Sequence, residues 1–254
     1  MTRPDNPFAA AGAGAQYHQG RPYHHPRSIA RIFTMLGIET ASRALDVACG
    51  TGMSTVALAD RVDAVVGVDR SSDMLAFAPR ADRVNYAFST AEALPFEDAS
   101  FDGVTTCSGV HWFDQPRFFA ECRRVLRGAG WIALYDHYFL GEMVDVPEFA
   151  VWTRELFKKY PLPARTPQVG DPRSEQPPGF TKVGDEFFAD DIEMTHDGFV
   201  DYILSISNLV AAAEGGIPRA ELRDEMRSTT AAFFAGSQPS TVRFLGSITC
   251  LRVA

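Results

Sequence analysis

The chain has 254 residues, 46% of them hydrophobic and 22% charged, and a formal net charge of −8. This size and balance predict a folded catalytic domain and exclude a fibrous or wholly disordered chain, while the negative charge without a Lys/Arg cluster argues against nucleic acid as a partner. No run approaches the roughly 18 apolar residues of a membrane span, and four dispersed cysteines with no leader pattern favour the cytoplasm.

The N-terminal part divides into two predicted pieces. Residues 1–16, which include the AAAGAGA stretch, are expected to be flexible. Residues 17–40 are expected to form a cap, in which a turn at YHQGRPYHHP leads into an amphipathic helix at RSIARIFTMLG. Residues 17–254 are predicted to form a single domain, as a monomer or homodimer.

Seven β-like runs alternate with helical segments along the rest of the chain. The runs are RALDV, AVVGV, VNYAF, FDGVTTC, WIALYD, KVGDEFF and TVRFLGSITCLRVA. Such alternation predicts an α/β fold with a doubly wound, mostly parallel seven-stranded sheet, and the last strand is expected to be antiparallel.

The alternation is broken at about residues 139–180. One helical piece, VPEFAVWTRELFKKY, precedes a proline-rich stretch, and together they are interpreted as a helical and loop insertion that covers the cleft. The aromatic residues Phe149, Trp152, Phe157 and Tyr160 on that piece could pack on the core or form the roof of an acceptor pocket.

The strongest local signal is ALDVACGTG at residues 44–52, where an apolar strand enters a turn with Gly50 and Gly52. Glycines let the backbone turn tightly and approach a ligand, but this spacing alone also suits a nicotinamide dinucleotide. Asp46 is expected to decide between them, because two anions about 4 Å apart repel by about 1–4 kcal/mol. A phosphate-free sulfonium cofactor is therefore favoured.

A second acid, Asp69, ends the strand AVVGV, where a carboxylate can accept hydrogen bonds from ribose hydroxyls. This role would serve either cofactor.

The segments DVACGTG, GVDRSSDML, STAEALPFEDASFDGV and CSGVHWFD together resemble the class I S-adenosylmethionine-dependent methyltransferases of the type 11 branch, over roughly residues 43–136. The resemblance implies a Rossmann-like methyltransferase fold, S-adenosyl-L-methionine as cofactor and S-adenosyl-L-homocysteine as product. It also implies that the acceptor is a small molecule, and the charge and the lack of a long apolar run leave neither nucleic acid nor a membrane as an expected partner.

The resemblance also assigns cofactor contacts. Those to the methionine half and to the sulfonium side are Asp46, Ala48, Gly50, Gly52, Ser108 and Val110. Asp69 would bind the ribose, and the adenine would be lined by Arg70, Met74, Thr90, Ala91 and Glu92. Family members often carry Asp where Thr90 stands.

The YHQGRPYHHP segment resembles the cap of relatives that carry an HWF-type motif, including a branch that methylates carboxylates such as trans-aconitate. In that picture Tyr17 closes over the cofactor and Arg21 pairs with the cofactor carboxylate. No i, i+4 His/Glu pattern and no cysteine cluster accompanies His24 and His25, so a structural or solvent-facing role is expected and no metal is predicted.

Methyl transfer from a sulfonium is an in-line displacement that requires alignment more than a catalytic triad. His111 and His137, which follow neighbouring strands, are the candidate general bases. Trp112, Tyr138 and Trp152 are the candidate acceptor contacts. The leading hypothesis is transfer to an O, N or C atom of a small molecule, with a carboxylate or secondary metabolite among the candidates. The alternatives are a catalytically silent cofactor-binding protein and a nicotinamide oxidoreductase.

Overall fold

The computed structural model describes residues 13–163, 176–234 and 239–254. Its seven-stranded sheet has the order β3-β2-β1-β4-β5-β7-β6. The strands are β1 (Ala41–Val47), β2 (Val62–Asp69), β3 (Val84–Phe88), β4 (Phe101–Cys107), β5 (Leu126–Met143), β6 (Phe180–Met194) and β7 (Ser240–Val253). β1 to β5 pair in parallel, and β7 runs antiparallel to both β5 and β6. The predicted doubly wound sheet with an antiparallel end is confirmed.

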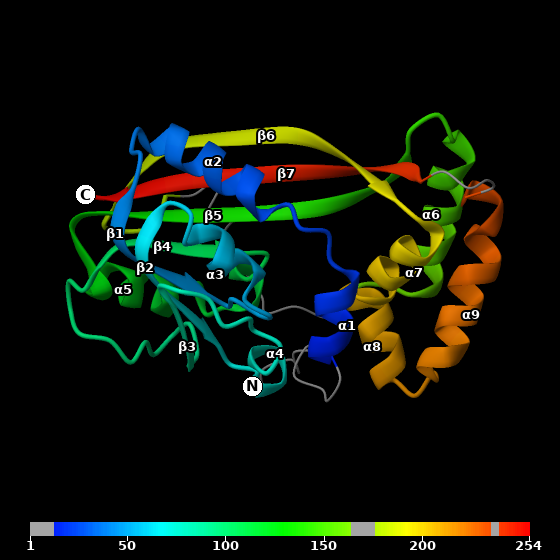
Figure 1. Ribbon diagram of the computed structural model, residues 1–254, viewed down its shortest axis with the longest axis horizontal. Coiled ribbons are helices and arrows are strands. Elements are labelled where there is room, and N and C mark those ends of the chain that lie inside the picture. Colours follow the sequence, from blue (N-terminus) through cyan, green and yellow to red (C-terminus); the bar gives the residue numbers. More distant parts are fainter. Residues whose placement is uncertain (1–12, 164–175, 235–238) are drawn as a thin grey trace.

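Helices cover both faces of this sheet (Figure 1). Phe33 of α2 (His25–Leu36) and Leu58 of α3 (Met53–Leu58) pack with Val65 on one face. Phe118 of α5 (Gln115–Val125) packs with Val104 on the other. Each helix buries an apolar stripe against strands whose side chains are themselves mostly buried, as a sheet covered on both faces requires.

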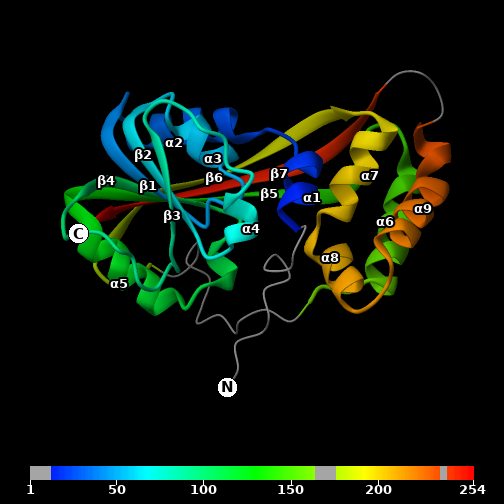
Figure 2. The ribbon, with the colours of Figure 1, turned by 60° about the horizontal axis from the view of Figure 1, so that its bottom comes forward.

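A second group of helices lies beyond one end of the long strands (Figures 1 and 2). It contains α6 (Pro147–Lys159), α7 (His196–Leu204), α8 (Ser207–Glu214) and α9 (Arg219–Thr230). These helices share an apolar cluster with the far ends of the strands, including Met143 of β5, Met194 of β6 and Val242 of β7. The helical unit is therefore packed on the extended ends of these strands. The helix α1 (Ala13–Gly20) lies between this unit and the rest of the sheet (Figure 1).

The boundaries of the predicted insertion need correction. β5 continues through Met143, because Gly141 adopts a φ of +75° and the register with β7 shifts between Phe139 and Glu142. A glycine at such an angle accommodates a bulge without ending the strand. The helical part therefore begins only at α6, and residues 164–175 of the proline-rich stretch lie outside the described residues.

The start of the chain also differs from the expectation. Residues 13–16, taken as flexible, belong to α1, whose Gly14 amide donates to the Asp73 carboxylate at 2.8 Å, while residues 1–12 lie outside the described part. The apolar segment after β6 is two helices, because α7 ends at Leu204 and α8 begins at Ser207. Within the described residues, no helix combines the length and apolar character needed to cross a bilayer.

Candidate functional site

The C-terminal ends of β1, β2 and β4 meet beside the middle of β5, where Cys107 pairs with Tyr135. The turn after β1 is the most constrained part of this edge. Ala48, Gly50 and Gly52 adopt positive φ angles of 57°, 56° and 76°. A Cβ built on Gly52 would lie 2.5 Å from the hydroxyl oxygen of Tyr86, so both the angle and the space require glycine there. Gly52 is the N-cap of α3, and it thus fixes where the helix starts.

Asp46 lies beneath this turn and has no exposed surface. Its Oδ2 accepts hydrogen bonds from Ser54 Oγ at 2.6 Å and Thr55 Oγ1 at 2.7 Å, and its Oδ1 accepts from Thr105 Oγ1 at 2.9 Å. Burial raises the pKa of this carboxyl, while the three hydroxyls act in the opposite direction. Asp46 thus joins the first turn of α3 to β1 and β4 and does not line the described cavities, so its direct contact with a cofactor stays a prediction.

Asp69, at the end of β2, lies on the wall of the site. Its Oδ2 accepts from the Gly50 amide and its Oδ1 from the Ser71 amide, both at 2.8 Å. Burial raises the pKa of the Asp69 carboxyl, and these two amide bonds oppose that shift. The two bonds fix the carboxylate plane, and an ionised carboxylate can accept further hydrogen bonds from a ligand.

Two narrow cavities meet at Asp69. One, of about 80 Å³, is lined by Tyr17, His25, Ala48, Cys49, Gly50, Thr51, Met53, Ser54, Asp69, Met74, Cys107, Ser108, Gly109 and Trp112. The other, of about 50 Å³, is lined by Ala48, Asp69, Arg70, Ser89, Ala91, Glu92, Trp112 and Phe113. The shared residues Ala48, Asp69 and Trp112 make the two cavities one elongated site.

The loop after β3 supplies one end of this elongated site. Ala91 and Glu92 line it, whereas Thr90 pairs with Ala93 in an isolated bridge and is not on the described walls. Glu121 holds the loop from α5 by accepting a hydrogen bond from the Leu94 amide at 2.7 Å. The backbone of Thr90 closes the turn that presents its neighbours, and the contact of Thr90 with the adenine stays a prediction.

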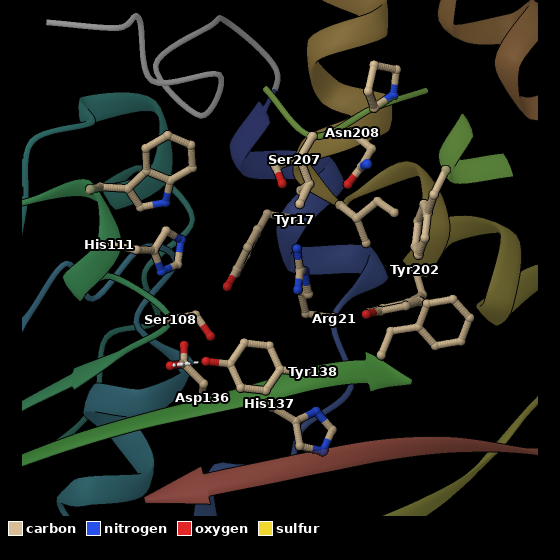
Figure 3. Close-up of a pocket in the computed structure, with 16 residues that line it drawn as sticks. Tyr17, Arg21, Ser108, His111, Asp136, His137, Tyr138, Tyr202, Ser207 and Asn208 are labelled. Carbon is tan, nitrogen blue, oxygen red and sulfur yellow. Dashed lines mark hydrogen bonds between the residues drawn. The ribbon is translucent and has the colours of Figure 1, made fainter. Parts of the chain in front are cut away.

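A larger cavity, of about 490 Å³, opens between the sheet edge and the helical unit (Figure 3). It shares Tyr17, Ser108 and Trp112 with the narrow cavity at the glycine turn. The rest of its wall is Arg21, His111, Asp136, His137, Tyr138, Phe139, Phe157, Pro161, Leu162, Tyr202, Ile206, Ser207 and Asn208. A ligand in the larger cavity would therefore lie next to a ligand at the glycine turn.

Arg21 lies on the wall of the larger cavity, whereas the sequence placed it with the cofactor. Its Nη2 donates to the carbonyl oxygen of Ser205 at 3.0 Å, and its guanidinium lies 4.7 Å from the ring centre of Tyr17 and 5.5 Å from that of Tyr202. Its buried Nε has no hydrogen-bond partner among the described residues. Figure 3 shows the guanidinium between Tyr17 and Tyr202, beside the open part of the cavity.

Both candidate bases line this cavity, but their surroundings differ. His137 is stacked between the rings of His24, at 3.9 Å, and Phe244, at 4.7 Å, and its Nε2 lies 3.0 Å from Asp190 Oδ2. Burial lowers the pKa of His137 to about 4. His111 lies instead in the short 3₁₀ helix Val110–Trp112. His111 is partly exposed there, whereas His137 is buried.

Of the three candidate acceptor contacts, two line the cavity and one does not. Trp112 and Tyr138 line the cavity, and the Tyr138 hydroxyl donates to Asp136 Oδ2 at 2.6 Å. Trp152 packs instead against Phe149, whose ring centre is 5.3 Å away, and belongs to the core of the helical unit. Trp152 packs on this core and is not on the described cavity walls, so its contact with an acceptor stays a prediction.

Other residues also differ from the sequence assignment. Val110 packs against the core of the sheet domain, and the described cavity walls do not include it. Phe157, for which core and roof were both open, lines the larger cavity, as do Tyr202 and Asn208, which the sequence did not single out. Tyr202 and Asn208 lie on separate helices, α7 and α8, far beyond β5 in the sequence, and no local pattern marks them.

Comparison with known proteins identifies the domain. Residues 45–134 match the methyltransferase domain model. The chain is 36% identical over 131 residues to an O-methyltransferase of Aspergillus nomiae, a match covering 48% of this chain and 58% of that protein. It is 31% identical over 137 residues to the 27-O-demethylrifamycin SV methyltransferase of Amycolatopsis mediterranei, covering 50% of each. The chain thus spans about half the length of these curated relatives.

A solved structure agrees over a greater length. A chain from Anaeromyxobacter dehalogenans, named as a type II methyltransferase, superimposes with a TM-score of 0.63 at 24% identity, covering 91% of this chain and 96% of that one. This likeness concerns the fold, and the family match covers the strands that build the glycine turn. The domain match and the relatives together support a class I S-adenosylmethionine-dependent methyltransferase domain at residues 45–134.

Proposed function

We propose that this protein transfers a methyl group from S-adenosylmethionine to a small molecule held in the 490 Å³ cavity. The observation that carries the proposal is the junction at Tyr17, Ser108 and Trp112, where that cavity meets the site at the glycine turn. Two adjoining sites with a common wall are what an in-line transfer between two ligands requires.

The elongated site suits the cofactor chemically. Asp69 would accept the ribose hydroxyls, and Met74, Ala91 and Trp112 would supply apolar surface to the adenine. The backbone at Gly50 carries no side chain toward the site, so a ligand can approach it closely. When bound, S-adenosylmethionine supplies the activated methyl group. The hydroxyls around Asp46 separate its charge from the site, so Asp46 no longer argues for one cofactor over another. The match to the methyltransferase domain is now the reason for choosing S-adenosylmethionine.

The protein's own residues would align the acceptor and exclude water. His111 would accept a proton from the acceptor, a contribution typically worth about 10² to 10⁴-fold. Tyr138 would stay fixed by its hydrogen bond to Asp136 and form one wall. An oxygen acceptor is favoured, since both relatives described above are named as O-methyltransferases.

Arg21 would select an acceptor that carries an acidic group. A guanidinium with an unsatisfied Nε in a partly apolar cavity attracts a carboxylate strongly. The described residues form no ion pair with Arg21, and the acid on the same cavity wall, Asp136, accepts a hydrogen bond from Tyr138. The acceptor would therefore be a carboxylic acid with an apolar body.

Cofactor binding is tested by calorimetry with S-adenosylhomocysteine on protein freed of bound cofactor. Asp69→Asn should weaken binding at least about tenfold, because one charge-assisted bond to the ribose is lost. Asp63→Asn changes an exposed acid near the start of the same strand and should leave affinity unchanged. Absence of binding by the wild-type protein, or equal affinity of the two variants, would contradict the proposal.

A further inference from the structure

Two imidazoles and a thiol come together next to the cofactor site without a part in the proposed reaction. One ligand atom each from His24, His25 and Cys107 lies within 4.8 Å of the others. His24 precedes α2 and His25 is its first residue, whereas Cys107 is the last residue of β4. We propose that this cluster binds a transition-metal ion of the zinc type through three protein ligands.

The donor set selects the class of metal. Imidazole nitrogen and thiolate are the preferred donors of Zn²⁺, and Co²⁺ can report on the same site because both ions accept nitrogen and sulfur. In a tetrahedral site with bonds of about 2.0–2.3 Å the ligand atoms lie about 3.5 Å apart. The present spread of up to 4.8 Å would therefore contract by about 1 Å on binding.

Neighbouring groups already hold the two rings. The hydroxyl oxygen of Tyr135 lies 3.1 Å from Nδ1 of His25, and that of Ser28 lies 3.5 Å from Nδ1 of His24. The His24 ring is also stacked on His137 with an interplanar angle of 8°. Outer contacts of this kind fix the orientation of metal-binding histidines.

Metal binding would deprotonate one ligand. The thiol proton of Cys107 would leave to solvent as the metal–sulfur bond forms, and each imidazole would donate the lone pair of a neutral ring nitrogen.

The position of the cluster leaves a coordination site accessible. His25 and Cys107 both line the narrow cavity that contains Gly50 and Asp69. A metal held by three protein ligands keeps a fourth position for water or another oxygen donor, and here that position would face this cavity. The ion would also join the start of α2 to the end of β4, two segments more than 80 residues apart in the sequence.

The test uses the full chain, stripped with a chelator and titrated with Co²⁺ and then with Zn²⁺ against a chromophoric competitor. We expect one ion per chain and a cobalt spectrum with a thiolate charge-transfer band. Cys107→Ala should remove this band and weaken Zn²⁺ binding at least about 100-fold, and His24→Gln should weaken binding while keeping the band. Cys250→Ala, at a buried cysteine in β7, is the matched control and should keep both.

Circular dichroism establishes that each variant is folded before titration. Failure of the wild-type chain to bind Co²⁺ at micromolar concentration, or retention of the thiolate band in Cys107→Ala, would overturn the proposal. Metal binding is read without any methyl acceptor, so its failure leaves the proposed methyl transfer untouched.

Discussion

The backbone amide of Gly50 donates a hydrogen bond to the Asp69 carboxylate, with 2.8 Å between N and Oδ2. This bond connects the turn after β1 to the end of β2, so the glycine turn and the acid that would bind the ribose form one preorganised unit. Its geometry depends on the positive φ angles of the turn and on the buried anchor at Asp46 beneath it.

Replacing Gly52 by alanine should destabilise the turn after β1. Gly52→Ala combines the unfavourable φ with a clash against Tyr86, whereas Gly37→Ala has a similar φ of +66° and no neighbour within 4 Å. We expect Gly37→Ala to lower the free energy of unfolding by about 1–2 kcal/mol, and Gly52→Ala to lower it by about 1–3 kcal/mol more. Urea unfolding measures both, and equal losses would show that the Tyr86 contact relaxes freely.

The hydroxyls around Asp46 should stabilise the fold. Thr55→Val removes a donor from a buried carboxylate and should cost about 1–3 kcal/mol. Thr106→Val is the control, because the Thr106 hydroxyl is buried without a hydrogen-bond partner among the described residues, and its loss should be nearly neutral. If the two substitutions have the same effect on the unfolding midpoint in urea, Asp46 does not need its hydroxyl partners.

Arg21 should determine affinity for the acceptor. Once labelled methyl transfer identifies an acceptor acid, Arg21→Met should raise its KM at least about tenfold, and Arg21→Lys should raise it less because a point charge is retained. Arg154→Met, at an exposed position of α6, should leave KM unchanged. An unchanged KM in Arg21→Met would remove the case for an acidic acceptor.

His111 should influence the chemical step more than His137. His111→Gln should lower kcat at pH 7 by about 10²-fold, the loss of a general base. His137→Gln should change kcat by only a few-fold but lower Tm, because its ring is stacked between two others and bound by Asp190. Single-turnover rates separate these outcomes, and a larger kcat loss in His137→Gln would reverse the assignment.

The contribution of Glu121 to the stability of the protein, through the loop after β3, should depend on pH. The hydrogen bond from Arg124 lowers the pKa of this carboxyl below its usual 4.5. Its stabilising effect is therefore complete above the pKa of the unfolded chain and is lost as the pH falls through the lower folded value. The stability difference between wild type and Glu121→Gln should shrink from pH 7 to pH 3. Glu97→Gln, at an exposed position in the loop before β4, should show no such change.

Short sequence patterns were sufficient to predict the parallel sheet and the position of the glycine turn. The strand-turn-helix at residues 44–52 and the acid at Asp69 are encoded within short segments, because apolar runs, turn glycines and strand-end acids act over a few residues. The match of residues 45–134 to the methyltransferase domain covers these same segments.

The tertiary structure decided what each of these side chains faces. Three hydroxyls from two elements enclose Asp46, the helical unit brings Tyr202 and Asn208 to the larger cavity, and Cys107 joins His24 and His25. Sequence determines which residues end a strand, whereas the contacts of those residues depend on how distant strands and helices pack. Burial and pairing therefore become known only when the sheet is assembled.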